Sequence, residues 1–372
     1  MNDILIVEIY SALVLYEKIE YEIFGNEFLY CSKGLFDDFT QLPQADKKIA
    51  VLGANYVSHS FDVAHVPAVD LSMFDLLIIF DQELLPGDTP EEYLELTRAR
   101  FSIDNVVIVT GAIKQNITLT IDKIFVFPLF LIEVSYSNTY TENTTTKSKL
   151  FDALLGIEKP HRAKIFEKLC TTNLLDKSYV SLINNDYKGN ISTIYYSPEL
   201  QQLEQAEAVR AKELNSGVFN SYEYTLSHPR LPHIRYPVSR QIPSSIYQNS
   251  YYSIVAETNW NQYVFSTEKT VKPLFARRLF VMFSAQHHLK QLQEYGFKTF
   301  SSVIDESYDN EVDDELRWDM AFDQIIALSN MDPIWVQEKI KDILEHNYTL
   351  INDRARLIAP IRDWLLPHIK AS

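Results

Sequence analysis

Short apolar runs alternate with longer polar segments along the first 135 residues. The runs are residues 4–10, 47–53, 75–81, 105–111 and 123–130, and all are rich in Val, Ile and Phe. Short apolar runs bounded by polar segments are typical of strands buried in a parallel sheet. Residues 90–100 begin with acidic side chains and end with basic ones, which suits a helix dipole. The pattern predicts an α/β domain with right-handed crossovers.

A second α/β pattern begins near Leu150, after a hydroxyl-rich stretch at 135–150 that we interpret as a linker. Helices are expected at 160–170, 206–214, 267–278 and 287–296, and over most of the last 40 residues. Strands are expected at 251–257 and 279–284, with a short one at 298–304, while the four prolines of 226–248 predict an irregular, extended segment. We therefore expect one domain at residues 1–150 and a second at 151–355.

Charge and glycine content remove several classes of protein. The chain has 372 residues and a net charge of −16, from 34 Lys+Arg and 50 Asp+Glu. That balance argues against duplex DNA binding through the overall field, although a local basic site stays open. The nine glycines form no G-x-G, no phosphate-binding P-loop and no G-x-S-x-G. Dinucleotide-binding, P-loop and α/β-hydrolase activities are therefore not expected.

Cysteine and histidine usage points to a metal-free intracellular protein. Only two cysteines occur, no H-E-x-x-H is present, and no two aspartates are two positions apart. The start lacks the basic and apolar regions of a signal peptide, and the apolar run 124–134 is too short to span a bilayer. We expect no cofactor, no transmembrane segment, and a cytoplasmic location, which would be the host cytoplasm for a viral protein.

The most informative stretch is residues 251–308. Glu257 ends an apolar strand, and a Ser-Thr-Glu-Lys step then opens a helix, with Ser266 or Thr267 as a candidate N-cap. A helix N-terminus binds diphosphates readily, and Lys269 and Lys272 add positive charge there. A lysine in a first turn opposes the helix dipole, so an anion is expected nearby. Glu268 is placed to accept hydrogen bonds from vicinal hydroxyls. The alternative is a surface helix held by salt bridges.

Several segments together resemble one enzyme family. Residues 251–260 (YYSIVAETNW) and 263–285 (YVFSTEKTVKPLFARRLFVMFSA) resemble the donor-binding signature of α1,3-fucosyltransferase-like glycosyltransferases. Residues 158–169 (EKPHRAKIFEKL) are similar to the family's upstream arginine-containing helix, and residues 296–309 to the tail of its bacterial and viral members. The chain departs from the family at Thr258, where an asparagine is usual.

The resemblance implies a GT-B fold, in which two Rossmann-like domains face a central cleft. The C-terminal domain would bind a nucleotide-diphosphate sugar and the N-terminal domain the acceptor. Lys269 and Arg162 would hold the diphosphate, Glu268 the ribose, and Glu257 the donor sugar; Thr267 and Lys272 belong to the same donor-binding set. The final helix, residues 356–372, would cross back to the N-terminal domain, so Trp364 should contact residues before Leu150.

The base that deprotonates the acceptor should come from the N-terminal domain. Asp81 and Glu83 follow the third predicted strand, at the edge where α/β sheets bind ligands. His59, Asp62 and His65 form a second candidate set. Ordinary loop carboxylates and surface histidines are the alternative interpretation, and the family motifs do not extend to this region.

These features predict an inverting, metal-independent glycosyltransferase that uses a nucleotide-diphosphate sugar, GDP-fucose by analogy. The acceptor would be a hydroxyl of a glycan. Hydroxymethylated DNA bases are the alternative acceptor, because some viral glycosyltransferases modify them. A catalytically inactive nucleotide- or carbohydrate-binding protein is the alternative of another class. Donor hydrolysis without acceptor would separate the enzyme from the binding protein.

Overall fold

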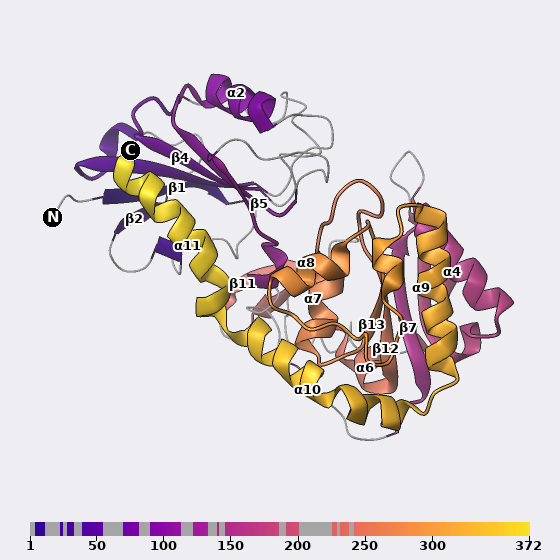
Figure 1. Cartoon of the computed structure of the whole chain (residues 1–372). Coiled ribbons are helices and arrows are strands. Elements are labelled where there is room, and N and C mark those ends of the chain that lie inside the picture. The colour runs from indigo at the N-terminus through magenta and orange to yellow at the C-terminus, as the bar shows by residue number, and fades with distance from the viewer. Residues whose placement is uncertain are drawn as a thin grey trace. The chain divides into compact units, whose positions relative to one another are not determined.

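The computed structural model describes residues 4–11, 23–24, 28–32, 39–54, 70–81, 90–112, 122–132, 140, 146–185, 191–200, 225–228, 231–237 and 242–372. The chain forms two compact units (Figure 1). Unit 1 contains residues 1–136 and 354–372, and unit 2 contains residues 137–353. Each unit has its own mainly parallel sheet, which confirms the α/β class and the two Rossmann-like units expected from the sequence.

The sheet of unit 1 is parallel throughout. Its order is β2-β1-β3-β4-β5-β6, with bounds Leu29–Ser32, Ile4–Ser11, Lys47–Ala54, Leu76–Asp81, Val106–Thr110 and Ile124–Val126. Every residue of β4 and β5 is buried, as their unbroken apolar sequences predict. Each predicted apolar run holds one of these strands. Strand β2 was not predicted, because its sequence, LYCS, is short and has no distinct pattern.

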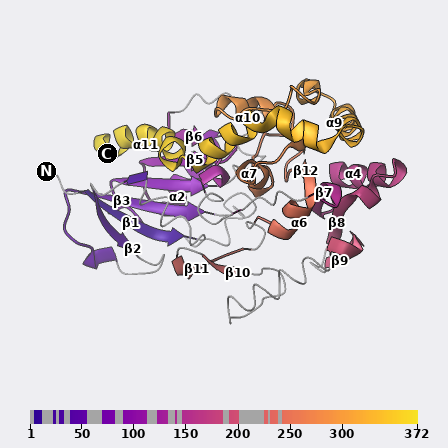
Figure 2. The ribbon, with the colours of Figure 1, turned by 90° about the horizontal axis from the view of Figure 1, so that it is seen from below.

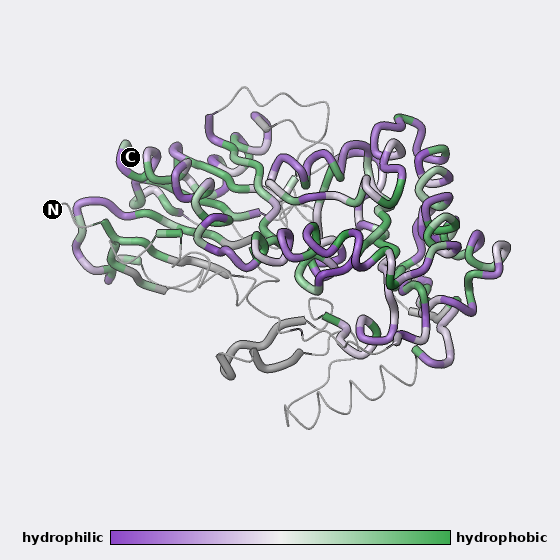
Figure 3. Tube along the Cα trace, turned by 60° about the horizontal axis from the view of Figure 1, so that its bottom comes forward, coloured by the Kyte–Doolittle hydropathy of each residue, from purple (hydrophilic) through white to green (hydrophobic). Residues whose placement is uncertain are grey.

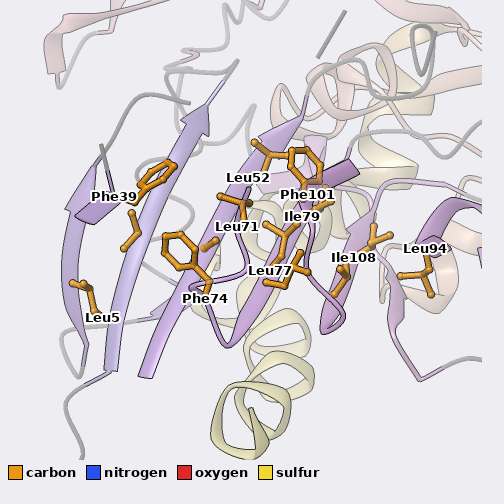
Figure 4. Close-up of a cluster of buried hydrophobic side chains, with 14 of the residues drawn as sticks. Leu5, Phe39, Leu52, Leu71, Phe74, Leu77, Ile79, Leu94, Phe101 and Ile108 are labelled. Carbon is orange, nitrogen blue, oxygen red and sulfur yellow. The ribbon is translucent and has the colours of Figure 1, made fainter. Parts of the chain in front are cut away.

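Helices of unit 1 cover both faces of this sheet. Helix α2 (Pro90–Phe101) contributes Tyr93, Leu94 and Phe101 to a core with side chains of β1, β3, β4 and β5 (Figure 4). Ile124 of β6 belongs to this core, so Phe125 points to the other face. There Phe125 stacks on Trp364 of α11 (Arg354–Ala371), with ring centroids 5.4 Å apart. Figure 2 shows α11 beside β5 and β6. Trp364 thus contacts a residue before Leu150, as predicted.

The sheet of unit 2 has the order β13-β12-β7-β8-β9. The bounds are Phe280–Phe283, Ser250–Ala256, Lys149–Ile157, Ser178–Asn185 and Ile191–Tyr196. Only β9 is antiparallel to its neighbour. Strands β10 (Thr225–His228) and β11 (Leu231–Pro237) form a separate antiparallel pair. The segment predicted to be irregular and extended at 226–248 is extended in this pair, but the regular pairing was not predicted. The prolines of the pair are tolerated because a two-stranded ribbon has only edge strands.

Helices of unit 2 begin at well-defined residues. They are α4 (Pro160–Thr171), α6 (Ser244–Asn249), α7 (Glu268–Phe275), α8 (His288–Glu294), α9 (Asp314–Ser329) and α10 (Pro333–Asn352). Asp313 and Asp332 cap α9 and α10 by accepting backbone N–H bonds. Helix α4 packs on α9, and α7 packs on α10. Apolar segments run through the inside of both units, and the outer helices alternate in hydropathy (Figure 3). None of the described helices is long and apolar enough to cross a membrane.

The predicted strand at 298–304 is wrong. These residues form an irregular, partly turned segment. Phe300 is buried edge-on against Phe280, with ring centroids 5.2 Å apart, and its N–H donates to Glu306 Oε1. A side chain therefore satisfies the backbone that a neighbouring strand would otherwise pair.

The connections of the unit 2 sheet diverge between two adjacent strands. Strand β7 continues through α4 to β8 on one side, whereas β12 continues through α7 to β13 on the other. In α/β sheets, ligands bind beyond the carboxyl ends of the strands at such a switch point. The starts of α4 and α7 lie at this edge of the sheet, so the residues there form the candidate site.

Candidate functional site

The start of α7 is held by a buried carboxylate. Glu257 follows β12 directly and is 0% exposed. Its Oε1 accepts from the Thr267 N–H at 3.0 Å and from the Thr270 hydroxyl, and its Oε2 accepts from the Thr267 hydroxyl at 2.6 Å and the Thr258 N–H at 3.1 Å. Of the two N-cap candidates in the sequence, Ser266 and Thr267, the N-cap is Thr267, whose hydroxyl accepts from the Lys269 N–H. The helix dipole is therefore compensated within the chain.

The start of α4 is held by a buried arginine. Arg162 is 4% exposed, and its guanidinium donates to the carbonyls of Ile157 at 2.7 Å, Ala256 at 3.1 Å and Glu257 at 3.3 Å. These carbonyls end β7 and β12, so Arg162 joins the two strands at the switch point. Gly156 has φ +67° beside a register shift in β7, a conformation that strains any residue with a Cβ. Burial lowers the pKa of Arg162 to about 10, against the charges of Glu257 and Glu268.

Two lysines converge on one residue between the helix starts. Lys269 Nζ donates to the Thr258 hydroxyl at 3.2 Å and to Glu268 Oε1 at 2.8 Å. Lys159 Nζ, at the N-cap of α4, donates to the Thr258 carbonyl at 2.7 Å. The sequence motif identified Lys269 but not Lys159. These two lysines are far apart in the sequence, and they come together only because β7 lies beside β12.

The charges of this cluster are unequal. Although burial opposes ionisation, the charges of Lys269 and Lys272 lower the pKa of Glu268 to about 2. Burial lowers the pKa of Lys272 to about 8, while Glu268 acts in the opposite direction. Glu268 is therefore ionised at neutral pH and Lys272 is mostly protonated. With Lys159 and Arg162, four cationic groups face the carboxylates of Glu257 and Glu268, an imbalance that favours an anionic ligand.

A buried histidine and a partly exposed tryptophan lie near the cluster. His288 is 0% exposed, and its Nε2 lies 2.9 Å from Ser266 Oγ. This bond joins the segment after β12 to the one after β13. Trp260 lies partly exposed in the loop after β12. Tyr251 and Tyr252 of β12 are buried.

The candidate bases of unit 1 are described only in part. Asp81 ends β4, is 0% exposed, and accepts a hydrogen bond from the Tyr93 hydroxyl at 2.8 Å. It thus lies at the carboxyl edge of its sheet, and the bond ties it to α2. Glu83, and the second set of His59, Asp62 and His65, lie outside the described residues. Within the described part of the chain, no cluster of three His, Cys, Asp or Glu has the arrangement of a metal site.

Comparisons with known proteins yield a structural likeness. No family model and no curated protein matches the chain. One solved structure that matches is a mutant of T4 phage BGT in complex with UDP-glucose. It is 12% identical to this chain, covers 99% of both chains, and has a TM-score of 0.45.

Proposed function

We propose that the chain is a glycosyltransferase that binds a nucleotide-diphosphate sugar at the carboxyl edge of the unit 2 sheet. The observation that carries this proposal is the convergence of Lys159 and Lys269 on Thr258, at the switch point between β7 and β12. Fixed cations beside a diphosphate stabilise the negative charge that develops on the leaving group. A cationic cluster in an acidic chain is consistent with such a ligand.

Each charged residue receives a role in this proposal. Lys269 and Lys159 contact the diphosphate, and Lys272 adds positive charge behind them. Arg162 contributes its charge while it joins the strand ends, so replacing it would perturb the fold together with the binding. Glu268, which is ionised, accepts hydrogen bonds from the ribose hydroxyls.

Glu257 receives a positioning role instead of the direct donor-sugar contact that the family resemblance implies. Its two oxygens already accept four hydrogen bonds from the start of α7 and from Thr258. Through these bonds Glu257 fixes Thr258, on which the lysines converge. Thr267 completes the same arrangement as the N-cap of α7.

The reaction proposed is a single inverting displacement. A base removes the proton of the acceptor hydroxyl, the oxygen attacks the anomeric carbon, and the bond between that carbon and the diphosphate oxygen breaks. The nucleoside diphosphate leaves with its charge neutralised by the lysines. Glu83 and Asp81 remain the proposed bases. GDP-fucose is the first donor to test, a glycan hydroxyl the first acceptor, and hydroxymethylated DNA the second.

A panel of nucleotides tests this function directly. GDP, UDP, CMP and dTDP, and the corresponding sugar donors, would be compared by calorimetry and by thermal shift. The cognate ligand should raise the melting temperature, because a ligand at a concentration 100 times its Kd stabilises the folded state by about 2.7 kcal/mol. Slow hydrolysis of that donor without acceptor would distinguish an enzyme from a binding protein. Absence of binding by every nucleotide in the panel would refute the proposal.

We also propose that turnover needs no metal ion, because the lysines and Arg162 neutralise the leaving group. Activity should therefore persist in excess EDTA with the cognate donor. Complete loss of turnover in EDTA, with recovery on adding Mn²⁺ or Mg²⁺, would refute this part of the mechanism while leaving the donor site in place.

A further inference from the structure

His161 is buried at the start of α4, and none of the described carboxylates is hydrogen-bonded to its ring. It is 0% exposed, and its Nε2 lies 2.9 Å from the Glu257 carbonyl. A carbonyl only accepts hydrogen bonds, so Nε2 carries the proton and donates it. Burial, with the positive charges of Arg162, Lys159 and Lys269, lowers the pKa of His161 to about 3. The imidazole is thus a neutral donor at physiological pH.

The same ring lies between two indoles. It stacks on Trp260 with centroids 5.3 Å apart and an interplanar angle of 21°, and it contacts Trp318 at 5.8 Å with an angle of 41°. Trp318 is a buried residue of α9, whereas Trp260 is partly exposed in the loop after β12. One imidazole therefore connects α4, α9 and the loop that contains Thr258.

Trp260 is fixed at its backbone as well. Arg317 of α9 donates from Nη2 to the Trp260 carbonyl at 3.0 Å. Lys159 Nζ lies 5.1 Å from the centroid of the Trp260 ring, within the range of a cation–π interaction. Thr258, which receives both lysines, is two residues before Trp260 and adjoins the Glu257 carbonyl that accepts from His161.

We propose that His161 is a positioning residue of the nucleotide-diphosphate site, and that it fixes the Thr258–Trp260 loop so that Lys159 and Lys269 converge. This inference rests on the function proposed above. Histidine suits the position because it combines a flat ring that stacks with an N–H that donates, and adds no charge beside three cations. Phenylalanine would supply only the ring, glutamine only the donor, and lysine or arginine a further charge.

Hydrogen exchange of the full chain without ligand tests the positioning directly. The amides of Thr258, Asn261 and Gln262 donate to side chains within this loop and report its order. We expect faster exchange at residues 258–262 in His161→Phe, and an intermediate rate in His161→Gln, which keeps a donor. His346→Phe is the matched control, because His346 Nε2 bonds the Gly296 carbonyl at 2.9 Å outside the site. The control should leave the loop unchanged.

Binding of nucleoside diphosphates to the same variants tests the link to function. His161→Phe should weaken the affinity for the cognate diphosphate by up to about tenfold, the loss of one hydrogen bond, and His161→Gln should recover part of it. Wild-type exchange in His161→Phe would overturn the inference, as would faster exchange with unchanged affinity. If His161→Phe fails to fold, the test rests on His161→Gln, which lacks the ring. Wild-type amide exchange at residues 258–262 in His161→Gln would also overturn the inference. If the wild type binds no diphosphate, the proposed function fails and exchange alone decides the positioning.

Discussion

The starts of α4 and α7 follow neighbouring strands of one sheet. They differ in the charge that lies at the positive end of the helix dipole. At α7, a hydroxyl cap from Thr267 and the carboxylate of Glu257 satisfy the free N–H groups. At α4, the N-cap position is Lys159, which offers no acceptor, and Pro160 removes one N–H altogether. One start carries its own anion, and the other carries a cation at its positive end.

This difference changes where an anionic ligand should bind. The Thr-Glu-Lys step of α7 has the sequence of a diphosphate site, yet the Thr267 N–H and hydroxyl already donate to Glu257, and the Lys269 N–H donates to Thr267. The positive field of α4 adds to the charges of Lys159 and Arg162 instead of being cancelled. Lys269 reaches towards that side through Thr258. If the proposed function holds, we expect the diphosphate to bind between the helices, on the α4 side of Thr258.

Removing the internal anion should have the largest effect. Glu257→Ala leaves three donors at the start of α7, and the Thr258 N–H, without their acceptor. Because hydrogen bonds to a charged group are worth about 1.5–3 kcal/mol each, we expect unit 2 to lose about 3 kcal/mol or more. Hydrogen exchange of the β12 and α7 amides would measure the loss without assuming that both units unfold together.

Glu345→Ala is the matched control for this change. Glu345 pairs with Arg277 in the same unit but is 55% exposed, so its loss should cost less than about 1 kcal/mol. Equal protection of α7 in Glu257→Ala and Glu345→Ala would show that the carboxylate does not hold the helix start, and the comparison of the two helices would fail.

The sequence predicts the part of this arrangement that is contiguous. Strands β1, β3, β4, β5 and β12 are predominantly apolar runs, so their burial follows from local pattern. The cap at Thr267 follows in the same way, because a cap and its helix are neighbours in sequence. The strand predicted at residues 298–304 is wrong because an irregular segment can also bury apolar side chains. Apolar content alone does not distinguish a buried strand from a buried irregular segment.

The rest of the site depends on contacts between distant segments. Lys159 and Lys269 meet only because β7 pairs with β12, and strand order cannot be deduced from single runs. His161 is enclosed by Trp318, a residue of α9 that its own segment gives no reason to select. Glu257 is visible in the sequence as a strand-end carboxylate, but its inward direction appears only when α7 folds over it.

The second prediction separates the two sides of the site. Lys159→Ala and Lys269→Ala should each weaken binding of the cognate nucleoside diphosphate by roughly 1.5–3 kcal/mol, because each removes a charge-assisted contact. Calorimetry would measure both. Lys168→Ala is the control: it removes a lysine of α4 that pairs with Asp319 away from Thr258. A loss in Lys269→Ala alone would place the diphosphate on α7 and contradict the contrast.

The third prediction uses pH to measure how much the charge of Lys272 in α7 contributes to stability and to diphosphate binding. Lys272 has a folded pKa of about 8, below its ordinary 10.5, and faces Glu268, Lys269, Asp152 and Glu257. Between these two pH values, the unfolded chain keeps a proton on Lys272 that the folded chain has lost. The free energy of unfolding should therefore rise with pH in this range.

Diphosphate affinity should change in the opposite direction. As pH rises through about 8, Lys272 loses its charge, and the affinity should fall by at most about tenfold per pH unit. In Lys272→Arg, which stays protonated, calorimetry from pH 7 to 9 should show a flat affinity. An equal fall in wild type and Lys272→Arg would assign the pH dependence to another group and leave Lys272 without a share in the site.

The last and smallest effect comes from giving α4 the kind of cap that α7 has. Lys159 has φ −146° and ψ 160°, the extended backbone of an N-cap, so a serine there can accept an N–H of the first turn. Lys159→Ser and Lys159→Ala both lose the ammonium and its bond to Thr258, and they differ only in the cap. We expect the serine variant to be more stable than the alanine variant by about 1 kcal/mol in urea unfolding followed through α4 amide exchange. The hydroxyl should not restore binding, since what the diphosphate needs at this helix start is a positive charge. Diphosphate affinity equal to wild type in Lys159→Ser would mean that the start of α4 takes no part in holding the anion.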